Sequence, residues 1–329
     1  MRNALFPHME WAKAHTRDPL PVELGFSGAK GPTGPAFREH ASGEAELETR
    51  IARRYGVPPE NVYLVGGTSL ANFVAIAAFC DPGDPVAVES PRYAPLGEIP
   101  RGLGATVLDV PRLERPLGPL PEGVPLAVVS TPHNPTGRVL KDDEWKELAR
   151  FADRGGVVVV DEVYRDLQAK PPVVAAARHP RFLTTGSFTK AYGLGALRIG
   201  WVLGAPDLLD RIRRTDNLVS VQVSTPSILA LKRAWPRLGS LRRRALAPVK
   251  ANLAALKRSR LPFVKPDAGL TALVRVGDGD TAATTLHSRG IAVAPGSFFG
   301  APDHVRIFLG ADRKAFATGL AALKSYCGL

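Results

Sequence analysis

Lys190 lies in a stretch of small and apolar residues, SFTKAYGLGALRIGW, that also contains Ser187 and Arg198. A lysine with such neighbours is expected to lose hydration, and a poorly hydrated amine is a nucleophile toward aldehydes. The alternative is a lysine at the rim of a loop, with its ammonium in water. Arg198 carries a planar fork of donors that suits phosphate or carboxylate. One short segment therefore offers a hydroxyl, an amine and a guanidinium.

Asp161 ends a run of four valines in VVVVDEVY, and Tyr164 follows it. Such a run is apolar on both faces, as in a central strand of a parallel sheet covered by helices. A carboxylate at the end of a buried strand requires a partner. That partner is either a group of the protein, through an N-cap or a salt bridge, or the protonated ring nitrogen of a ligand. In the second case Tyr164 would supply a hydroxyl nearby.

Two further polar segments follow predicted strands. HNPTG, which contains Asn134, comes after LAVVSTP, and ligands bind at the carboxyl ends of strands in α/β sheets. GGTS, with Gly67, Thr68 and Ser69, separates a strand from a helix, where backbone N–H groups and the helix dipole favour a phosphate. Each segment could also be a simple turn. Because GGTS is neither a Walker loop nor GxGxxG, a nicotinamide dehydrogenase is disfavoured.

Arg306 is surrounded by apolar residues in the alternating segment HVRIFLG. In a strand, Val305 and Ile307 would point to one face and Arg306 to the other. A buried arginine without a partner is costly, so we expect Arg306 to meet an anion.

The elements that must position these residues follow from hydrophobic periodicity. The predicted strands are residues 62–65, 85–90, 105–110, 126–132 and 157–161, with a further strand in IGWVLG. The predicted helices are residues 43–56, 70–80 and 141–156. Strands that alternate with helices indicate a doubly wound α/β domain.

The second part of the chain has a different pattern. From about residue 205 to about residue 260 it is helical and basic, and we expect a long arginine-rich helix to lead to the tail. The tail contains predicted strands at residues 271–276, 291–296 and 304–310 and predicted helices at residues 281–290 and 311–329. It is therefore interpreted as a small α+β domain.

Composition excludes several classes of protein. The 329 residues carry a net charge of +12, but no basic patch interleaved with aromatic residues is present, so we expect no nucleic-acid partner. No apolar run reaches the ~18 residues of a membrane helix, and the charged N-terminus lacks the apolar core of a signal peptide. Two cysteines imply no disulfide framework. We expect a cytoplasmic protein without membrane or metal ligands.

Together these segments resemble the fold-type I enzymes that depend on pyridoxal 5′-phosphate, specifically class I/II aminotransferases similar to aspartate aminotransferase. The resemblance runs from about residue 45 to the C-terminus. It depends on the order and spacing of GGTSLAN, DPGDPVAVESPRY, HNPTG, VVVVDEVY, SFTKAYGLGALRIGW, PDAGL, APGSFFG and VRIFLG.

The resemblance implies roles around the cofactor ring. Lys190 would form the Schiff base and then, as a free amine, move the proton of the substrate. Asp161 would keep the ring nitrogen protonated. Asn134 and Tyr164 would bind the ring 3-oxygen, and Tyr93 would stack on the ring.

The resemblance also implies roles at the two ends of the ligand. The residues that would bind the phosphate are Gly67, Thr68, Ser69, Ser187 and Arg198. Arg306 would clamp the substrate α-carboxylate, with Asn134 and Gly28 nearby. The implied reaction moves an amino group between an L-amino acid and a 2-oxo acid, in a homodimer.

The implied fold is α/β. A large domain of residues 45–239 would hold a mostly parallel mixed sheet flanked by helices and would bind the cofactor. Residues 1–44 would join residues 240–329 in a smaller α+β domain.

Other functions remain open at this point. A carbon–sulfur β-lyase or a decarboxylase could use the same scaffold, because the bond that breaks at Cα depends on how the substrate is oriented. Arg306 argues against decarboxylation, since it would hold the carboxylate. A non-catalytic ligand-sensing domain of a transcription regulator is a further alternative, and it is disfavoured because no DNA-binding domain precedes GGTS.

Overall fold

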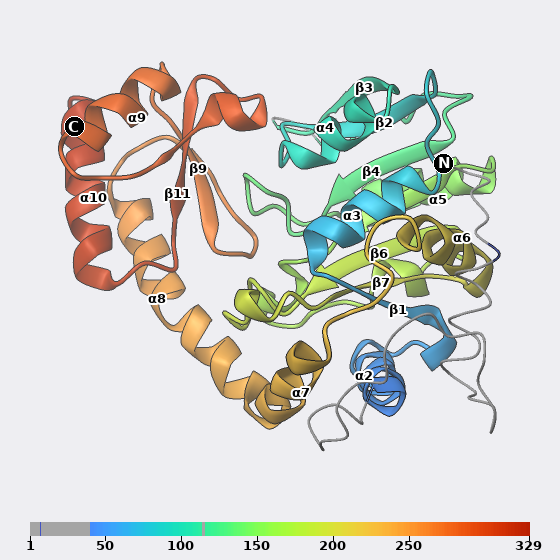
Figure 1. The fold of residues 1–329 in the computed structure, drawn as a ribbon. Helices are drawn as coiled ribbons and strands as arrows, with labels where there is room; N and C mark the ends of the chain where they lie inside the picture. The colour runs from blue at the N-terminus through green and yellow to red at the C-terminus, as the bar shows by residue number, and fades with distance from the viewer. Residues whose placement is uncertain (1–6, 8–39, 114–115) are drawn as a thin grey trace.

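The structure, a computed structural model, describes residue 7 and residues 40–113 and 116–329. Within these ranges a sheet of seven strands and a sheet of four strands organise the fold. Figure 1 shows the two sheets apart from each other, with the long helix α8 (Leu238–Arg258) running between them.

The larger sheet is mostly parallel. Its strands are β1 (Val62–Val65), β2 (Pro85–Ser90), β3 (Thr106–Pro111), β4 (Leu126–Ser130), β5 (Val157–Asp161), β6 (Phe182–Ser187) and β7 (Gly200–Leu203). They lie in the order β1-β7-β6-β5-β4-β2-β3. Strand β7 is antiparallel to both of its neighbours, and the other pairs are parallel. The predicted α/β class with a mixed, mostly parallel sheet is confirmed.

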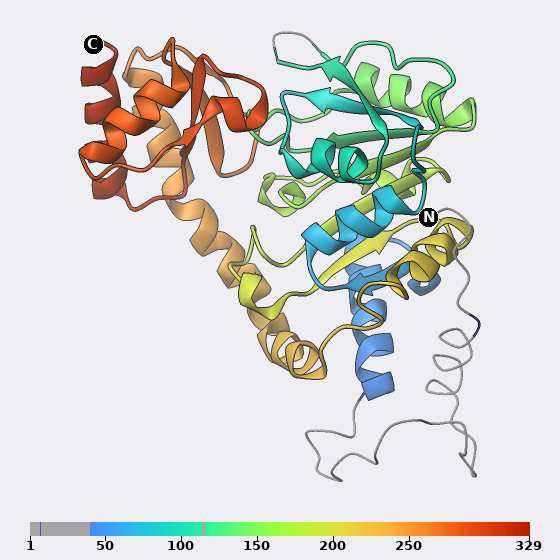
Figure 2. The ribbon, with the colours of Figure 1, turned by 45° about the horizontal axis from the view of Figure 1, so that its top comes forward.

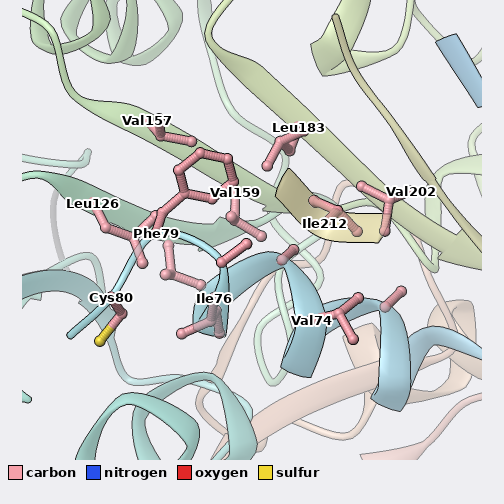
Figure 3. Packing of buried hydrophobic residues seen from close by; sticks show 14 of the residues in the cluster. Val74, Ile76, Phe79, Cys80, Leu126, Val157, Val159, Leu183, Val202 and Ile212 are labelled. Carbon is pink, nitrogen blue, oxygen red and sulfur yellow. The ribbon is translucent and has the colours of Figure 1, made fainter. Parts of the chain in front are cut away.

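The valine run of β5 lies at the centre of this sheet and is buried on both faces. Val157 and Val159 belong to one hydrophobic cluster, and Val158 and Val160 belong to another. Figure 3 shows the first cluster, which brings these two valines together with Val74 and Ile76 of helix α3 (Thr68–Ala77). Alternation along the strand therefore anchors β5 from two sides and fixes the position of its last residue, Asp161.

Helices cover both faces of the larger sheet. Besides α3, they are α2 (His40–Tyr55), α4 (Pro95–Gly102), α5 (Asp142–Asp153), α6 (Pro206–Asp216) and α7 (Thr225–Ala234). Short 3₁₀ helices are η2 (Pro59–Asn61), η3 (Arg165–Leu167), η4 (Ala175–Ala177), η5 (Gly195–Leu197), η6 (Trp235–Arg237) and η7 (Gly296–Phe299). Helices α3 and α6 share one cluster, and α5 covers the opposite face. No helix in the described ranges is long and apolar enough to cross a bilayer.

The sequence pattern predicted one long helix for the basic region after the sheet, and this prediction is wrong. The region forms α6, α7 and α8, and the chain leaves the helical conformation between α6 and α7. Val221 in this connection has a φ of 67°, which a β-branched residue in a helix does not adopt. Pro226 then lies in the first turn of α7, where its missing N–H is tolerated and a new helix can begin.

The smaller sheet is antiparallel throughout, in the order β10-β11-β9-β8. Its elements are β8 (Phe263–Val264), β9 (Thr271–Arg275), α9 (Gly279–Ser288), β10 (Ala294–Pro295), β11 (His304–Phe308) and α10 (Arg313–Tyr326). In the turned view of Figure 2, α9 and α10 lie toward the outer side of this sheet. Val305 and Ile307 of β11 are buried in its core cluster, and Arg306 points to the other face, as the alternation predicted.

The two sheets meet through the turn that follows β4. The carbonyl oxygen of Gly137 accepts hydrogen bonds from the backbone N–H groups of Asp267 and Ala268, at 2.9 and 3.0 Å. Gly137 has a φ of +74°, and a Cβ atom there would lie 2.5 Å from the Cβ of Pro266. Glycine is therefore required both by the backbone conformation and by the close approach. This contact brings β11 to the carboxyl edge of the larger sheet.

Candidate active site

A cavity of about 250 Å³ lies at the carboxyl ends of β4, β5 and β6. The N-terminus of α3 borders it, and Arg306 of β11 reaches it from the smaller sheet. The residues that line it are Thr68, Ser69, Asn72, Tyr93, Ser130, Pro132, Asn134, Asp161, Val163, Tyr164, Ser187, Thr189, Lys190, Arg198 and Arg306.

Most of the residues that the sequence singled out line this one cavity. They are Thr68, Ser69, Tyr93, Asn134, Asp161, Tyr164, Ser187, Lys190, Arg198 and Arg306. Gly67 does not line the cavity but borders it as the residue before α3. Gly28 lies outside the described residues. Segments from distant parts of the chain therefore converge here, because parallel strands end at the same edge of a sheet.

Asp161 is buried at the end of β5, with 5% of its surface exposed. Its Oδ2 accepts a hydrogen bond from Asn72 Nδ2 at 2.8 Å, and its Oδ1 accepts one from the Val163 N–H at 2.9 Å. Burial raises the pKa of Asp161, and the two hydrogen bonds act against this rise. A buried carboxylate with spare lone pairs facing a cavity is suited to a cationic or N–H-bearing ligand.

The start of α3 is suited to an anion. The Thr68 hydroxyl oxygen is buried and has no hydrogen-bond partner among the described residues, which is costly unless a ligand supplies one. Arg198 Nη2 donates to the carbonyl oxygen of Gly66 at 3.0 Å. A Cβ atom at Gly67 would lie 2.6 Å from the same nitrogen. Gly67 thus lets the guanidinium approach the helix N-terminus, where its charge adds to the helix dipole.

The solvent exposure of Lys190 differs from the prediction made from the sequence. Its side chain is exposed, whereas the neighbouring small and apolar residues predicted a desolvated amine. The reason is local: Lys190 follows the end of β6 in a turn, and the apolar side chain of Phe188 beside it is the one that enters the core. The alternative of a lysine at a loop rim is therefore the better description of this structure, with the rim belonging to the cavity.

Arg306 enters the cavity as a directed donor. Its Nη1 donates to Asn134 Oδ1 at 2.9 Å, and its guanidinium carbon lies 4.6 Å from the ring centroid of Phe299. Burial lowers the pKa of Arg306 below its usual range, although a guanidinium remains charged. Tyr164 is also buried, and burial raises its pKa. The cavity is therefore lined by the cation Arg306 as well as by the carboxylate of Asp161.

His133, beside Asn134, is a buried supporting residue. Its Nε2 lies 2.8 Å from the Pro91 carbonyl oxygen, which can only accept, so Nε2 carries the proton. Nδ1, 2.7 Å from the Thr136 hydroxyl, then accepts. Burial, followed by the charge of Arg112, lowers the pKa of His133 to about 3, although Nε2 is 3.7 Å from a Glu89 carboxylate oxygen. We conclude that His133 is neutral, because desolvation outweighs that carboxylate.

Because His133 is neutral in the folded chain, we can predict how the free energy of unfolding changes at low pH. The unfolded chain binds a proton at His133 below a pH of about 6.5, but the folded chain does not until about pH 3. Stability therefore falls as the pH drops through this window, by about 1.4 kcal/mol per pH unit from this group. We expect the difference in unfolding free energy between wild type and His133→Gln to shrink with that slope below pH 6.5. A difference independent of pH would contradict a neutral His133.

Sequence reasoning missed several cavity residues, including Asn72, Ser130 and Val163. One signal was available for Asn72: it lies four residues after Thr68, so both occupy the same face of α3. Ser130 is the last residue of β4 and could have been selected by the rule that selected Asp161. Val163 contributes through its backbone N–H, and the side-chain pattern carries no sign of that.

The two-sheet fold is shared with solved structures of aminotransferases. A solved structure of a variant of the aspartate aminotransferase from Thermus thermophilus superposes with a TM-score of 0.78, covering 97% of this chain and 91% of that chain. Its sequence is 23% identical, so the likeness concerns the fold alone.

Sequence comparison identifies the family. Residues 37–323 match the family model described as aminotransferase class I and II. The chain is 31% identical to a protein named aspartate aminotransferase from Thermococcus kodakarensis, covering 86% of this chain and 78% of the relative. It is 30% identical to a protein named capreomycidine synthase from Streptomyces vinaceus, covering 89% and 81%. The chain belongs to the class I and II aminotransferase family, and its cofactor is pyridoxal 5′-phosphate.

The cavity fits that cofactor. The Thr68 hydroxyl, which has no hydrogen-bond partner within the described part of the chain, and the Arg198 guanidinium offer donors for a phosphate. Asp161 offers a buried acceptor for a protonated ring nitrogen, and Lys190 offers an amine at the rim. These donors and acceptors match an anionic group, a cationic ring and an aldehyde, so the chemistry of the cavity agrees with the family.

Proposed function

We propose that this chain transfers an amino group between an L-amino acid and a 2-oxo acid, with the cavity at the carboxyl edge of the larger sheet as its active site. The observation that carries the proposal is the convergence of Lys190, Asp161 and Arg306 on this cavity from three separate elements. An amine, a buried carboxylate and a guanidinium are the groups needed to bind an aldehyde cofactor and an amino acid together.

The cofactor would be held at both ends by this chain. Thr68, Ser69, Ser187 and Arg198, with Gly67 at the helix N-terminus, would bind the phosphate. Asp161 would bind the protonated ring nitrogen.

Pyridoxal phosphate, when bound, supplies an electron sink for the charge left on the substrate Cα. Asn134 and Tyr164 would bind the ring oxygen, and Tyr93 would pack on the ring. Lys190 would attach the cofactor covalently through Nζ and, once released, carry the proton to and from the substrate Cα as a general base and acid. Arg306 would hold the substrate α-carboxylate and so fix which Cα bond faces Lys190.

Two measurements test the proposal. Borohydride treatment of the holoenzyme should abolish its visible absorption band, and peptide mapping should find the cofactor on Lys190. A panel of amino acids assayed with 2-oxoglutarate or pyruvate should then yield new keto acids without ammonia release. Cofactor on a different lysine would overturn the assignment of Lys190, and the absence of keto acid from the whole panel would overturn the reaction.

A second reaction class is kept because a relative's name indicates one. The relative named capreomycidine synthase, whose name is not that of an aminotransferase, is matched along 89% of this chain. Elimination from the substrate, as in a β-lyase, would release ammonia together with a keto acid. The same panel therefore separates the two reactions by the presence of ammonia.

Substitution of Arg306 with lysine tests the substrate side of the site. Lysine keeps the charge but cannot reproduce the fork of a bidentate pair with a carboxylate. We expect amino-acid binding to weaken by about 1.5–3 kcal/mol, the value of a hydrogen bond to a charged group. The Michaelis constant should therefore rise about tenfold to a hundredfold. Amines without a carboxylate should be affected much less, and the cofactor spectrum should be unchanged.

An unaltered Michaelis constant for every amino acid, or loss of the cofactor, would show that Arg306 is not the carboxylate clamp. Arg275→Lys is a matched control. Arg275 lies on the neighbouring strand β9, and its side chain is exposed and pairs with Asp303. This control should leave the Michaelis constant at its wild-type value.

We also propose two domains that divide near the start of α8, with residues 45–239 in the large one and residues 1–44 and 240–329 in the small one. The side chains of α8 pack against two different hydrophobic clusters along the helix, and this supports a division within it. Leu241 and Leu246 pack against the cluster of the larger sheet, whereas Leu253 and Leu256 pack against that of the smaller sheet. Limited proteolysis should then cut first within α8, between Leu246 and Leu253, and initial cuts within β4–β6 would contradict a division there.

The assembly is proposed to be a cytoplasmic homodimer. Support comes from exposed apolar side chains beside the larger sheet. Leu218 and Val219 are 39% and 50% exposed, and Phe73, Ile99 and Leu103 line an open apolar groove. Sedimentation of the holoenzyme tests this state, and a species with the single-chain mass of 35.2 kDa would contradict it.

A further inference from the structure

Asn72 makes two directed hydrogen bonds behind the cavity. It is 1% exposed in the middle of α3, and its Nδ2 donates to Asp161 Oδ2 at 2.8 Å. Its Oδ1 accepts from Thr185 Oγ1 at 2.5 Å. Thr185 is fully buried on β6 and lies directly opposite Asp161 in the register of β5 and β6. Three residues from three elements therefore form one buried chain of hydrogen bonds.

The direction of this chain is set by its chemistry. An ionised carboxylate can only accept, so the Asn72 amide must turn its NH₂ toward Asp161 and its oxygen toward Thr185. A reversed amide would place two oxygens with lone pairs against each other. The Thr185 hydroxyl must then donate its one proton to Asn72 Oδ1. Each donor thus points toward the carboxylate, and adjacent hydrogen bonds in such a chain polarise one another.

These bonds also restrict the orientation of the carboxylate. Asn72 holds Oδ2 from α3, and the Val163 N–H holds Oδ1 from the segment after β5, at 2.9 Å. With one bond to each oxygen, the plane of the Asp161 carboxylate cannot rotate without breaking one of them. Burial raises the pKa of Asp161 and so opposes its charged form, whereas the Asn72 bond favours that form.

We propose that Asn72, held in place by Thr185, is a positioning residue that fixes the Asp161 carboxylate toward the ring nitrogen of the bound cofactor. This inference rests on the proposed function, since it requires Asp161 to meet that nitrogen. Asn72 lines the cavity as well, but its two bonds go to protein groups, and it acts through Asp161. Removing it should change what Asp161 does for the cofactor more than it changes the fold.

The test compares holoenzymes of four variants with wild type. Asn72→Leu removes both bonds at similar volume, and Thr185→Val removes the outer bond while keeping the shape of the side chain. Thr185→Ser keeps the hydroxyl. The matched control is Thr184→Val, because Thr184 is an equally buried threonine of β6 whose hydroxyl accepts from the Ala176 N–H and bonds to the Glu162 carboxylate rather than to Asn72. Because successive residues of a strand point to opposite faces, the side chain of Thr184 lies on the face of β6 opposite to that of Thr185.

Three quantities are measured: the dissociation constant of the cofactor, the pH midpoint of its visible band, and kcat and KM separately. In Asn72→Leu we expect cofactor binding to weaken about tenfold, as for loss of a hydrogen bond to a charged group. The pH midpoint should shift, and kcat should fall with KM nearly unchanged. Thr185→Val should show the same changes at about threefold. Thr185→Ser and Thr184→Val should match wild type in all three.

Asp161→Asn, assayed alongside, separates the failure of this inference from that of the proposed function. If Asp161→Asn changes these quantities while Asn72→Leu and Thr185→Val do not, the positioning role is overturned and the proposed function stands. If Asp161→Asn leaves them at wild-type values, the assignment of Asp161 fails and takes the inference with it. Equal effects of Thr184→Val and Thr185→Val would also overturn the inference, because the loss would then be one of general stability. If Asn72→Leu does not fold, Thr185→Val decides.

Discussion

Replacement of Lys190 with alanine is expected to reduce turnover by at least about 10³-fold, since proton transfer by a positioned side chain alone contributes about 10²–10⁴-fold. Loss of the covalent attachment adds to this effect. The fold should survive because the Lys190 side chain is exposed at the cavity rim, and surface substitutions typically change stability by less than about 0.5 kcal/mol. Single-turnover assays with the cofactor in excess measure the effect directly.

The matched control is Lys170→Ala, since Lys170 is another exposed lysine but lies outside the residues that line the cavity. It should keep wild-type turnover. Added small primary amines should restore part of the activity of Lys190→Ala, because they can enter an open cavity and carry the proton. Turnover near the wild-type value in Lys190→Ala would show that a different group performs the chemistry.

Asp161→Asn is the second substitution with a large expected effect. Asparagine has nearly the same volume, so packing around the end of β5 should be preserved. It has no negative charge for a protonated ring nitrogen, and removal of one partner from a buried ion pair costs about 3–5 kcal/mol. If this cost falls on catalysis, the single-turnover rate drops at least about a hundredfold.

Asparagine also replaces one oxygen by an NH₂ group, and this group faces either Asn72 Nδ2 or the Val163 N–H, which are both donors. A modest loss of stability is therefore expected beside the catalytic loss, and urea unfolding measures it separately. Glu60→Gln, an exposed substitution of the same chemical type far from the cavity residues, serves as the control. A rate close to wild type in Asp161→Asn would assign Asp161 a structural role only.

Much of the fold follows from periodicity and strand-end chemistry. The predicted ranges 62–65 and 85–90 coincide with β1 and β2, because turns rich in Gly and Pro bound each strand. Asp161 was found as a carboxylate at the end of an apolar strand, and Arg306 was found from alternation in β11. Such signals are local: a strand end and a two-residue period are visible in the sequence without knowledge of what packs nearby.

Other features depend on contacts that no single segment carries. The exposure of Lys190 depends on how the turn after β6 lies relative to the cavity. The role of Asn72 depends on the rotation of α3 against β5 and β6, which the cluster around Val74 and Val159 fixes. The predicted strand at 291–296 is reduced to Ala294–Pro295, since only these two residues pair with β11, and Pro295 has no N–H to contribute to that pairing.

The position of Arg306 on the smaller sheet has a consequence for how this protein can change in evolution. Among the described residues that line the cavity, Arg306 alone comes from the smaller sheet, and the others come from the larger sheet and its loops. With the roles proposed above, retention of the cofactor and the clamp on the substrate α-carboxylate are encoded in separate stretches of the sequence. Mutations that accumulate in residues 263–308 can therefore alter how the substrate carboxylate is held while the cofactor site is inherited intact. Selection can act on the two properties one at a time.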